Sequence, residues 1–216
     1  VMCEEEGDYD SAAHWWAEAA ARGNRSAMYN LGVMHSWGHG VPASMEAASE
    51  CFEMAATARE KVSTSNSTKD EDETLRTEAL FRVGLAHLYS LGRPRSLKRA
   101  GAMFYDCASR GHAPSARELE IMMKTYRAAM PLPCSNPDCT KLDKPSTRLK
   151  LCPGCGGAAY CGSVCQKRHW AQHRGTCRQI KLARASETGK LSQRLQKGTS
   201  KELSQSYDTM PGLSVE

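Results

Sequence analysis

The sequence lacks both a membrane-spanning segment and a recognisable secretion signal. It has no run of 18 apolar residues, about the shortest that reads as a transmembrane helix. Its first ten residues, VMCEEEGDYD, have neither the basic start nor the apolar stretch of a signal peptide. We therefore expect an intracellular protein, cytoplasmic and/or nuclear. Because the chain begins with Val rather than Met, we also expect further sequence upstream.

The chain also has little net charge for its size, and that charge is unevenly distributed. The formal charge is +5, but residues 1–133 carry 15 basic and 18 acidic side chains, whereas 134–177 carry 7 and 2. The second segment also holds seven cysteines, and negative charge on their sulfur atoms would offset much of its basicity. No aromatic residues alternate with the basic ones for base stacking. Nucleic acid is therefore not the expected partner.

Cysteine is scarce outside one segment. Seven of the ten cysteines lie between Cys134 and Cys177, and only Cys3, Cys51 and Cys107 lie elsewhere. Clustering at short spacings in an intracellular chain favours metal binding over disulfides. The isolated cysteines within apolar helical stretches are expected to behave as small hydrophobic residues.

The N-terminal half repeats itself. SMEAASECFEMAA (44–56) aligns with DYDSAAHWWAEAA (8–20) at an offset of 36 residues, and 79–104 aligns with 27–52 at an offset of 52. Such periods indicate stacked helical hairpins. The 16 extra residues fit a polar insertion loop at 59–76, which has no hydrophobic period. His35, His39 and His87 then fall near the hairpin turns, where we expect a packing role.

This pattern predicts a mostly α fold. Glycine ends the first helix of each hairpin and proline leads into the second. The expected elements are a lone helix at 8–22 without its upstream partner, hairpins at 25–58 (helices about 26–37 and 44–58) and 76–110 (helices about 78–90 and 96–110), and a final helix at 114–129. The stretch YNLGVMHSWGHGVP and the Ala-rich helix after it resemble the Sel-like, tetratricopeptide-related repeats. This resemblance implies an α-solenoid over residues 1–130.

Four pairs of metal-ligand residues follow. The pairs are Cys134-x4-Cys139, Cys152-x2-Cys155, Cys161-x3-Cys165 and His173-x3-Cys177. Eight such ligands suffice for two tetrahedral zinc sites. Spacing alone leaves the pairing open: the pairs combine either in sequence or interleaved. His169 competes with His173, but Cys177 needs a nearby partner and His173 supplies it. With few large apolar residues in this segment, we expect it to unfold without metal.

The stretch YCGSVCQKRHWAQHRGTC (160–177), preceded by CSNPDC and CPGC, resembles a MYND finger, which we assign to residues 131–178. The resemblance implies interleaved pairing, with Cys134, Cys139, Cys161 and Cys165 on one zinc ion and Cys152, Cys155, His173 and Cys177 on the other. It also implies that Gln166 and Trp170, on a short helix at 163–173, line a groove for proline-rich peptides. The helix is expected to extend to about residue 187, and the polar tail, 179–216, to be largely disordered.

These features predict a protein–protein interaction adaptor with two structural zinc ions. A zinc ion with four protein ligands has no position for water or substrate. The Asn-His motif of the SET methyltransferases that carry a similar finger is absent, so no catalytic residues and no organic cofactor are expected. One alternative is the substrate receptor of an F-box ubiquitin ligase, whose F-box would lie upstream. The other is a nucleic-acid-associated transcriptional regulator. The oligomeric state is not predicted.

Overall fold

The computed structural model describes residues 8–58, 69–144 and 146–196, with side chains as far as Ser186. The described chain forms two compact units. The first ends at Ser96 and the second begins at Leu97. In these described ranges no helix is both long enough and apolar enough to cross a membrane.

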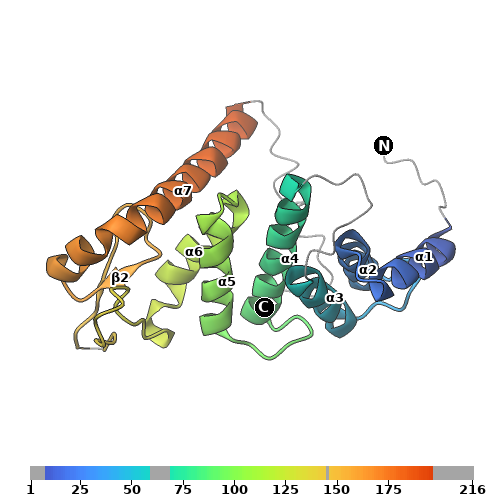
Figure 1. Ribbon diagram of the computed structural model, residues 1–216, viewed down its shortest axis with the longest axis horizontal. Helices are drawn as coiled ribbons and strands as arrows, with labels where there is room; N and C mark the ends of the chain where they lie inside the picture. The colour runs from blue at the N-terminus through green and yellow to red at the C-terminus, as the bar shows by residue number, and fades with distance from the viewer. Residues whose placement is uncertain (1–7, 59–68, 145, 197–216) are drawn as a thin grey trace. The chain divides into compact units, whose positions relative to one another are not determined.

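The first unit is a stack of antiparallel helices (Figure 1). The helices are α1 (Tyr9–Ala21), α2 (Arg25–Trp37), α3 (Met45–Thr57) and α4 (Lys69–Tyr89), and each packs on the next. Asp8, Asn24 and Ser44 begin the first three helices, because each side chain accepts a hydrogen bond from the backbone N–H three residues on. The expected helices 8–22, 26–37 and 44–58 are therefore confirmed.

The two hairpin turns are built identically, which confirms the 52-residue offset. The ring Nδ1 of His35 lies 3.3 Å from the carbonyl oxygen of Pro42. The equivalent His87 Nδ1 lies 3.2 Å from the oxygen of Pro94. In both turns the backbone oxygen of the histidine also accepts a 2.9 Å hydrogen bond from the serine that precedes the next helix. These two histidines thus close the turns.

Glycine in each turn allows the repeats to stack. Gly40 has a φ of 64°, and a Cβ atom there would overlap the backbone of Tyr9 at the start of α1. Gly92, also with a φ of 64°, sits in the same way against Met45 and Glu46 at the start of α3. Side chains other than glycine are strained at such φ values. Since α1 and α3 receive equivalent turns, α1 occupies the place of a second repeat helix.

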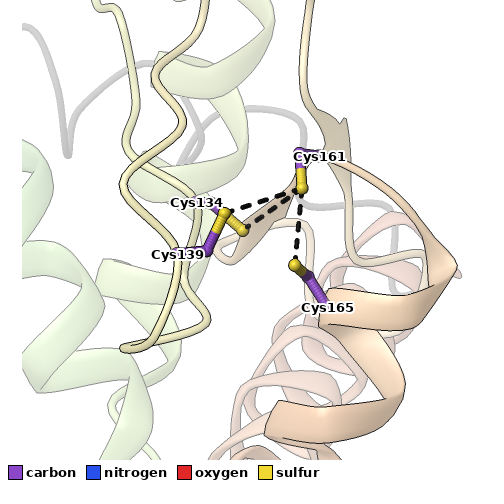
Figure 2. A group of neighbouring side chains, drawn as sticks. All are labelled: Cys134, Cys139, Cys161 and Cys165. Carbon is purple, nitrogen blue, oxygen red and sulfur yellow. Dashed lines mark hydrogen bonds between the residues drawn. The ribbon is translucent and has the colours of Figure 1, made fainter.

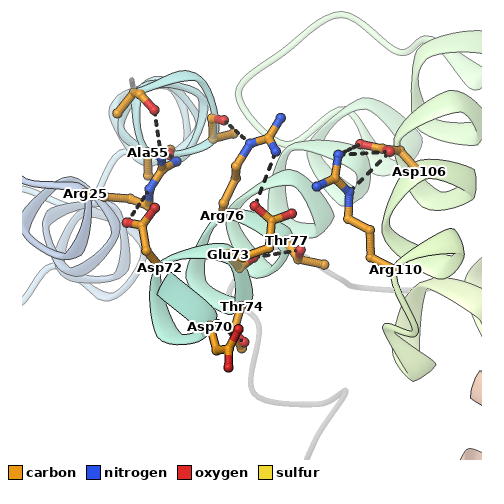
Figure 3. Close-up of polar contacts among 12 residues, drawn as sticks. Arg25, Ala55, Asp70, Asp72, Glu73, Thr74, Arg76, Thr77, Asp106 and Arg110 are labelled. Atoms are coloured by element: carbon orange, nitrogen blue, oxygen red, sulfur yellow. Dashed lines mark hydrogen bonds and ion pairs between the residues drawn. The ribbon is translucent and has the colours of Figure 1, made fainter. Parts of the chain in front are cut away.

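Helix α4 begins earlier than expected. The sequence pattern places residues 69–76 in the insertion loop, but α4 starts at Lys69. Its first turn contains three acidic residues, which the helix dipole favours. Asp72 accepts a 2.8 Å hydrogen bond from Arg25 Nε, and Arg76 Nε donates to the carbonyl oxygen of Ala56 at 3.2 Å (Figure 3). These contacts extend the helix by two turns, while residues 59–68 lie outside the described chain.

Arg25 also completes the end of α3. Its guanidinium is buried and donates to the carbonyl oxygens of Ala55 and Ala58, the second at 2.6 Å (Figure 3). The last carbonyls of a helix have no intrahelical donor. One side chain therefore satisfies the end of α3 and anchors the start of α4 through Asp72.

The second unit combines helices with a small β-hairpin. It contains α5 (Leu97–Ser109), α6 (Ala113–Thr125), the 3-10 turn η1 (Arg127–Ala129), β1 (Lys150–Leu151), β2 (Ala159–Tyr160) and α7 (Ser163–Gln196). The strands pair antiparallel, with Lys150 opposite Tyr160 and Leu151 opposite Ala159. The final repeat helix, expected at 114–129, ends at Thr125 and continues only as η1.

The core of this unit is shared between helices and the cysteine-rich segment. Its buried residues include Ala108 of α5, Ala116 of α6, Ala159 and Tyr160 of β2, and Ile180 of α7. A Cβ atom on Gly157 would lie 2.8 Å from the ring of Tyr105 and 3.0 Å from Leu119. The segment 134–177 thus folds directly against α5 and α6. This contact adds apolar burial that the sequence of the segment does not reveal by itself.

Helix α7 is much longer than the expected helix at 163–173 with its extension to about residue 187. It runs to Gln196 without a break (Figure 1). Ile180 and Ala183 are buried in the core, and Arg184 Nε lies 3.6 Å from Glu120 of α6. These contacts explain why the helix continues beyond the last cysteine. The expected disorder of residues 197–216 lies outside the described chain.

Replacing Arg25 by Ala should destabilise the first unit by about 1–3 kcal/mol, because Asp72 and two carbonyl groups lose their partner. Urea denaturation measures this change. The matched control is Arg22→Ala, which removes an exposed ion pair with Glu18 and should cost less than about 0.5 kcal/mol. Equal losses for the two variants would contradict the role of Arg25.

Candidate metal centres

Four cysteine side chains meet between the β-hairpin and the start of α7 (Figure 2). They are Cys134, Cys139, Cys161 and Cys165, whose sulfur atoms all lie within 4.8 Å of one another. The Sγ of Cys161 lies 4.0 Å from that of Cys134, 3.7 Å from that of Cys139 and 3.4 Å from that of Cys165. Sulfur ligands at 2.3 Å around a tetrahedral zinc ion are about 3.8 Å apart. The group therefore has the dimensions of a zinc site.

Backbone hydrogen bonds fix the loop that carries the first two of these cysteines. The N–H of Cys134 donates to the carbonyl oxygen of Lys141 at 2.8 Å, and the N–H of Cys139 donates to the carbonyl oxygen of Asn136 at 3.0 Å. Ser135 joins the loop to β2, because its N–H donates to the Ala159 oxygen at 2.7 Å while its Oγ accepts from the Ala159 N–H at 3.0 Å. The loop is thereby held beside Cys161, which directly follows β2.

Asn136 adds a polar contact to this group. It is buried, and its Nδ2 donates to the Sγ of Cys165 at 3.6 Å. Such a hydrogen bond stabilises negative charge on the sulfur and orients the ligand. Sequence reasoning missed Asn136 as a site residue. Its position within CSNPDC, between two ligands, was the only signal that pointed to it.

A buried carboxylate, also missed, holds the next loop. Both oxygens of Asp143 are used: Oδ1 accepts from the N–H of Leu149 at 2.6 Å, and Oδ2 lies 3.0 Å from Arg127 and 3.4 Å from Arg148. Because Arg127 belongs to η1, this network ties the loop after the first cysteine pair to the end of the repeat helices. Two cationic partners compensate the cost of burying the carboxylate.

The second group contains Cys152, Cys155, His173 and Cys177, all of them buried and with ligand atoms within 4.8 Å of one another. The Sγ atoms of Cys152 and Cys177 are 3.8 Å apart, and Cys155 Sγ lies 3.5 Å from Nε2 of His173. These spacings are again those of ligands around one tetrahedral ion. The last two residues are four positions apart on α7, which puts them on the same helical face.

The turn that carries Cys152 and Cys155 contains glycines, and one of them allows it to lie directly against Cys177. The N–H of Gly156 donates to the Cys152 oxygen at 2.7 Å, and Gly156 has a φ of 65°. A Cβ atom on Gly154 would lie 2.7 Å from the Sγ of Cys177. The turn therefore approaches the ligand on α7 so closely that a side chain at position 154 would collide with it.

The structure brings the eight proposed ligands into two groups of four, and the competing histidine belongs to neither. His169 points to Tyr160, with its Nδ1 3.0 Å from the phenol oxygen, and stacks on His173 at 5.5 Å between ring centroids. The pairs combine in the interleaved order and not in sequence. Each group thus joins a pair that precedes β2 to a pair that follows it.

Burial and crowding control the protonation of these ligands. Burial, with the nearby Cys155, raises the pKa of the Cys177 thiol to about 12. The hydrogen bond with Cys165 raises the pKa of Cys161 to about 12. Burial, together with His169, lowers the pKa of His173, which favours the neutral imidazole that metals bind. Closely packed thiols become thiolates when a cation neutralises them.

The two residues expected to line a peptide groove lie close to the second group of ligands. Gln166 is partly buried, and its Nε2 lies 3.9 Å from the Sγ of Cys152. Trp170 is 47% exposed, and its ring meets His173 edge-on at 6.1 Å between centroids. Both residues are therefore positioned by the metal ligands.

The donor sets fit zinc. Seven thiolates and one imidazole, in two groups of four, are the ligands of structural zinc sites. Soft sulfur ligands exclude the oxygen-preferring ions Mg²⁺ and Ca²⁺ as occupants. Because the protein supplies all four ligands at each position, zinc bound there would hold the segments together and leave no vacancy for substrate.

Comparisons with known proteins match both parts of the chain. Residues 133–177 match the family model of the MYND finger, and residues 4–24, 25–59 and 77–111 match that of the Sel1 repeat. A solved Sel1 repeat protein from Oxalobacter formigenes is similar, with 20% sequence identity and a TM-score of 0.44. The match covers 54% of this chain and 41% of that one, so this chain spans less than half of that protein's length.

Replacing Gly154 by Ala should empty the second site, because the new methyl group would meet the Sγ of Cys177. We expect zinc per chain, measured by mass spectrometry under native conditions, to fall from two to about one. The matched control is Gly162→Ala, since a Cβ atom there meets nothing within 4 Å. Two zinc ions retained in the Gly154 variant would refute the packing argument.

Zinc affinity should fall as pH falls. The raised pKa of Cys177 means that its thiol is protonated near neutral pH when no metal is bound, so zinc must displace that proton. Lower pH favours the protonated ligand and hence the metal-free protein. Competition with a chromophoric chelator between about pH 8 and pH 6 should show at least about a tenfold loss per pH unit. A flat profile would argue against thiolate ligation.

Proposed function

Since the chain joins Sel1 repeats to a MYND finger, both of them non-catalytic interaction modules, we propose that it is an adaptor whose finger, folded around two zinc ions, docks proline-rich segments of partner proteins. Gln166 and Trp170 line the docking groove, and the repeats supply a second surface for partners. The observation that carries this proposal is the closed second group of ligands, which holds both groove residues beside it.

Exposure and chemistry support Trp170 as the anchor. Its indole is about half exposed, while its edge-on contact with His173 fixes the ring orientation. Proline-rich segments adopt an extended left-handed helix and dock on aromatic surfaces without losing much conformational entropy. An exposed tryptophan on α7, in edge-on contact with His173, provides such a surface.

Gln166 supplies the polar part of the groove. Its amide nitrogen faces the Sγ of Cys152, so the amide group is oriented and its Oε1 points away from the sulfur. In a proline-rich segment the few remaining backbone N–H groups need acceptors. An oriented amide oxygen beside an aromatic ring satisfies this requirement and sets the register of the bound peptide.

A peptide titration tests this proposal. Isothermal titration of a synthetic proline-rich peptide into the zinc-loaded chain should give saturable binding, and Trp170→Ala should weaken it by at least about tenfold, as expected for loss of an aromatic anchor. Trp15→Ala is the matched control, because Trp15 is also exposed but lies on α1. Equal affinity of the wild-type and Trp170 variants would exclude this groove.

A further inference from the structure

Helix α7 has a second face that the zinc sites do not use. Its inner face carries His173, Cys177, Ile180 and Ala183, all of them buried. On the opposite side lie Val164, Ala171, Gly175 and Leu182, spaced by seven, four and seven residues, which places them in one line along the helix. Val164 is 62% exposed and Leu182 is 53% exposed.

The two small residues at the centre of this line are uncovered in the described chain. A Cβ atom built on Gly175 would meet nothing within 4 Å, and Ala171 is exposed. Two large apolar residues therefore lie at the ends of the line, with small residues between them. The distance from Val164 to Leu182 along the helix is about 27 Å, the length of about five helical turns.

The outer face is also strongly basic. From Ser163 to Ser186 the helix has six basic residues and no acidic residue. Arg184 lies on the inner side beside Glu120. The other five basic residues are exposed, and none of them forms an ion pair within the described chain. They are Lys167, Arg168, Arg174, Arg178 and Lys181. We call these five residues, together with the line from Val164 to Leu182, the basic face.

We propose that the basic face binds an acidic amphipathic helix of a partner protein. Apolar residues of the partner would cover Val164 and Leu182, and the small residues Ala171 and Gly175 would let the two helices approach closely. Acidic residues along the flank of the partner would pair with Lys167, Arg174, Arg178 and Lys181. Complementary charge of this kind fixes the register and accelerates association.

The apolar line favours a protein over other polyanions. A phosphate backbone would pair with the basic residues but would leave Val164 and Leu182 uncovered, whereas an amphipathic helix buries apolar and charged residues together. A membrane surface needs a broad apolar face that enters the lipid, and Ala171 and Gly175 provide little of it. Neither Gln166 nor Trp170 belongs to the line from Val164 to Leu182, but Trp170 borders Lys167 and Arg174 on the helix. The proposal rests on that line and on the basic residues, so it stands even if proline-rich binding fails.

Titration with a designed peptide tests this proposal. The probe is a synthetic helical peptide of about 20 residues with leucine on one face and glutamate along one flank, added to the zinc-loaded chain in about 50 mM salt. We expect binding that weakens as salt screens the charges. Arg174→Glu with Arg178→Glu should reduce affinity at least tenfold, and Gly175→Gln should reduce it several-fold.

The variants separate binding from folding. Gln has a higher helix propensity than Gly, so the Gly175 variant should melt no lower than the wild type while it binds more weakly. Lys144→Glu with Lys150→Glu makes the same charge change outside α7 and should alter affinity less than twofold. Each variant should retain two zinc ions per chain.

Four results would overturn the proposal. They are absence of peptide binding, equal binding of a scrambled peptide of the same composition, equal loss of affinity in the Lys144 and Lys150 control, and tighter binding of duplex DNA or anionic vesicles than of the peptide. The last result would assign the basic face to nucleic acid or to a membrane surface.

Discussion

The closure of two four-ligand groups by interleaved pairs is the constraint on which the second unit depends. The first group combines the cysteine pair before the β-hairpin with the pair that follows it, and the second combines the pair in the hairpin turn with the pair on α7. Because the two groups overlap along the chain, no part of residues 134–177 can detach without breaking one of them. The hairpin itself has only two residues in each strand. Strands this short contribute little stability in water. A metal ion held by each group would therefore supply the connections that hydrogen bonding lacks.

The finger is also continuous with the repeat helices that precede it. Gly157 lies against Tyr105 and Leu119, Asp143 binds Arg127, and Ile180 is buried in the same core as Ala116. Loss of metal would consequently expose apolar surface of α5 and α6 as well as that of the finger. Zinc binding and the stability of these helices are thus thermodynamically linked.

Helix α7 has two faces with different chemistry. The inner face carries ligands and apolar contacts, which explains its fixed position, whereas the outer face combines basic residues with exposed Val164 and Leu182. Because the inner face alone secures the helix, substitutions on the outer face can change recognition without changing the fold. This separation makes a rigid helix suitable as a docking surface.

Helical periodicity, the positions of glycine and proline and the spacing of cysteines are local properties, so the repeat helices, the turns between them and the eight candidate ligands could be predicted from the sequence. The remaining features depend on contacts between distant segments. Spacing could not choose between interleaved and sequential pairing, since both give complete tetrahedra. The early start of α4 depends on Arg25, 47 positions before Asp72, and the length of α7 depends on its contacts with α6. Such contacts join residues distant in the chain, so no local pattern encodes them.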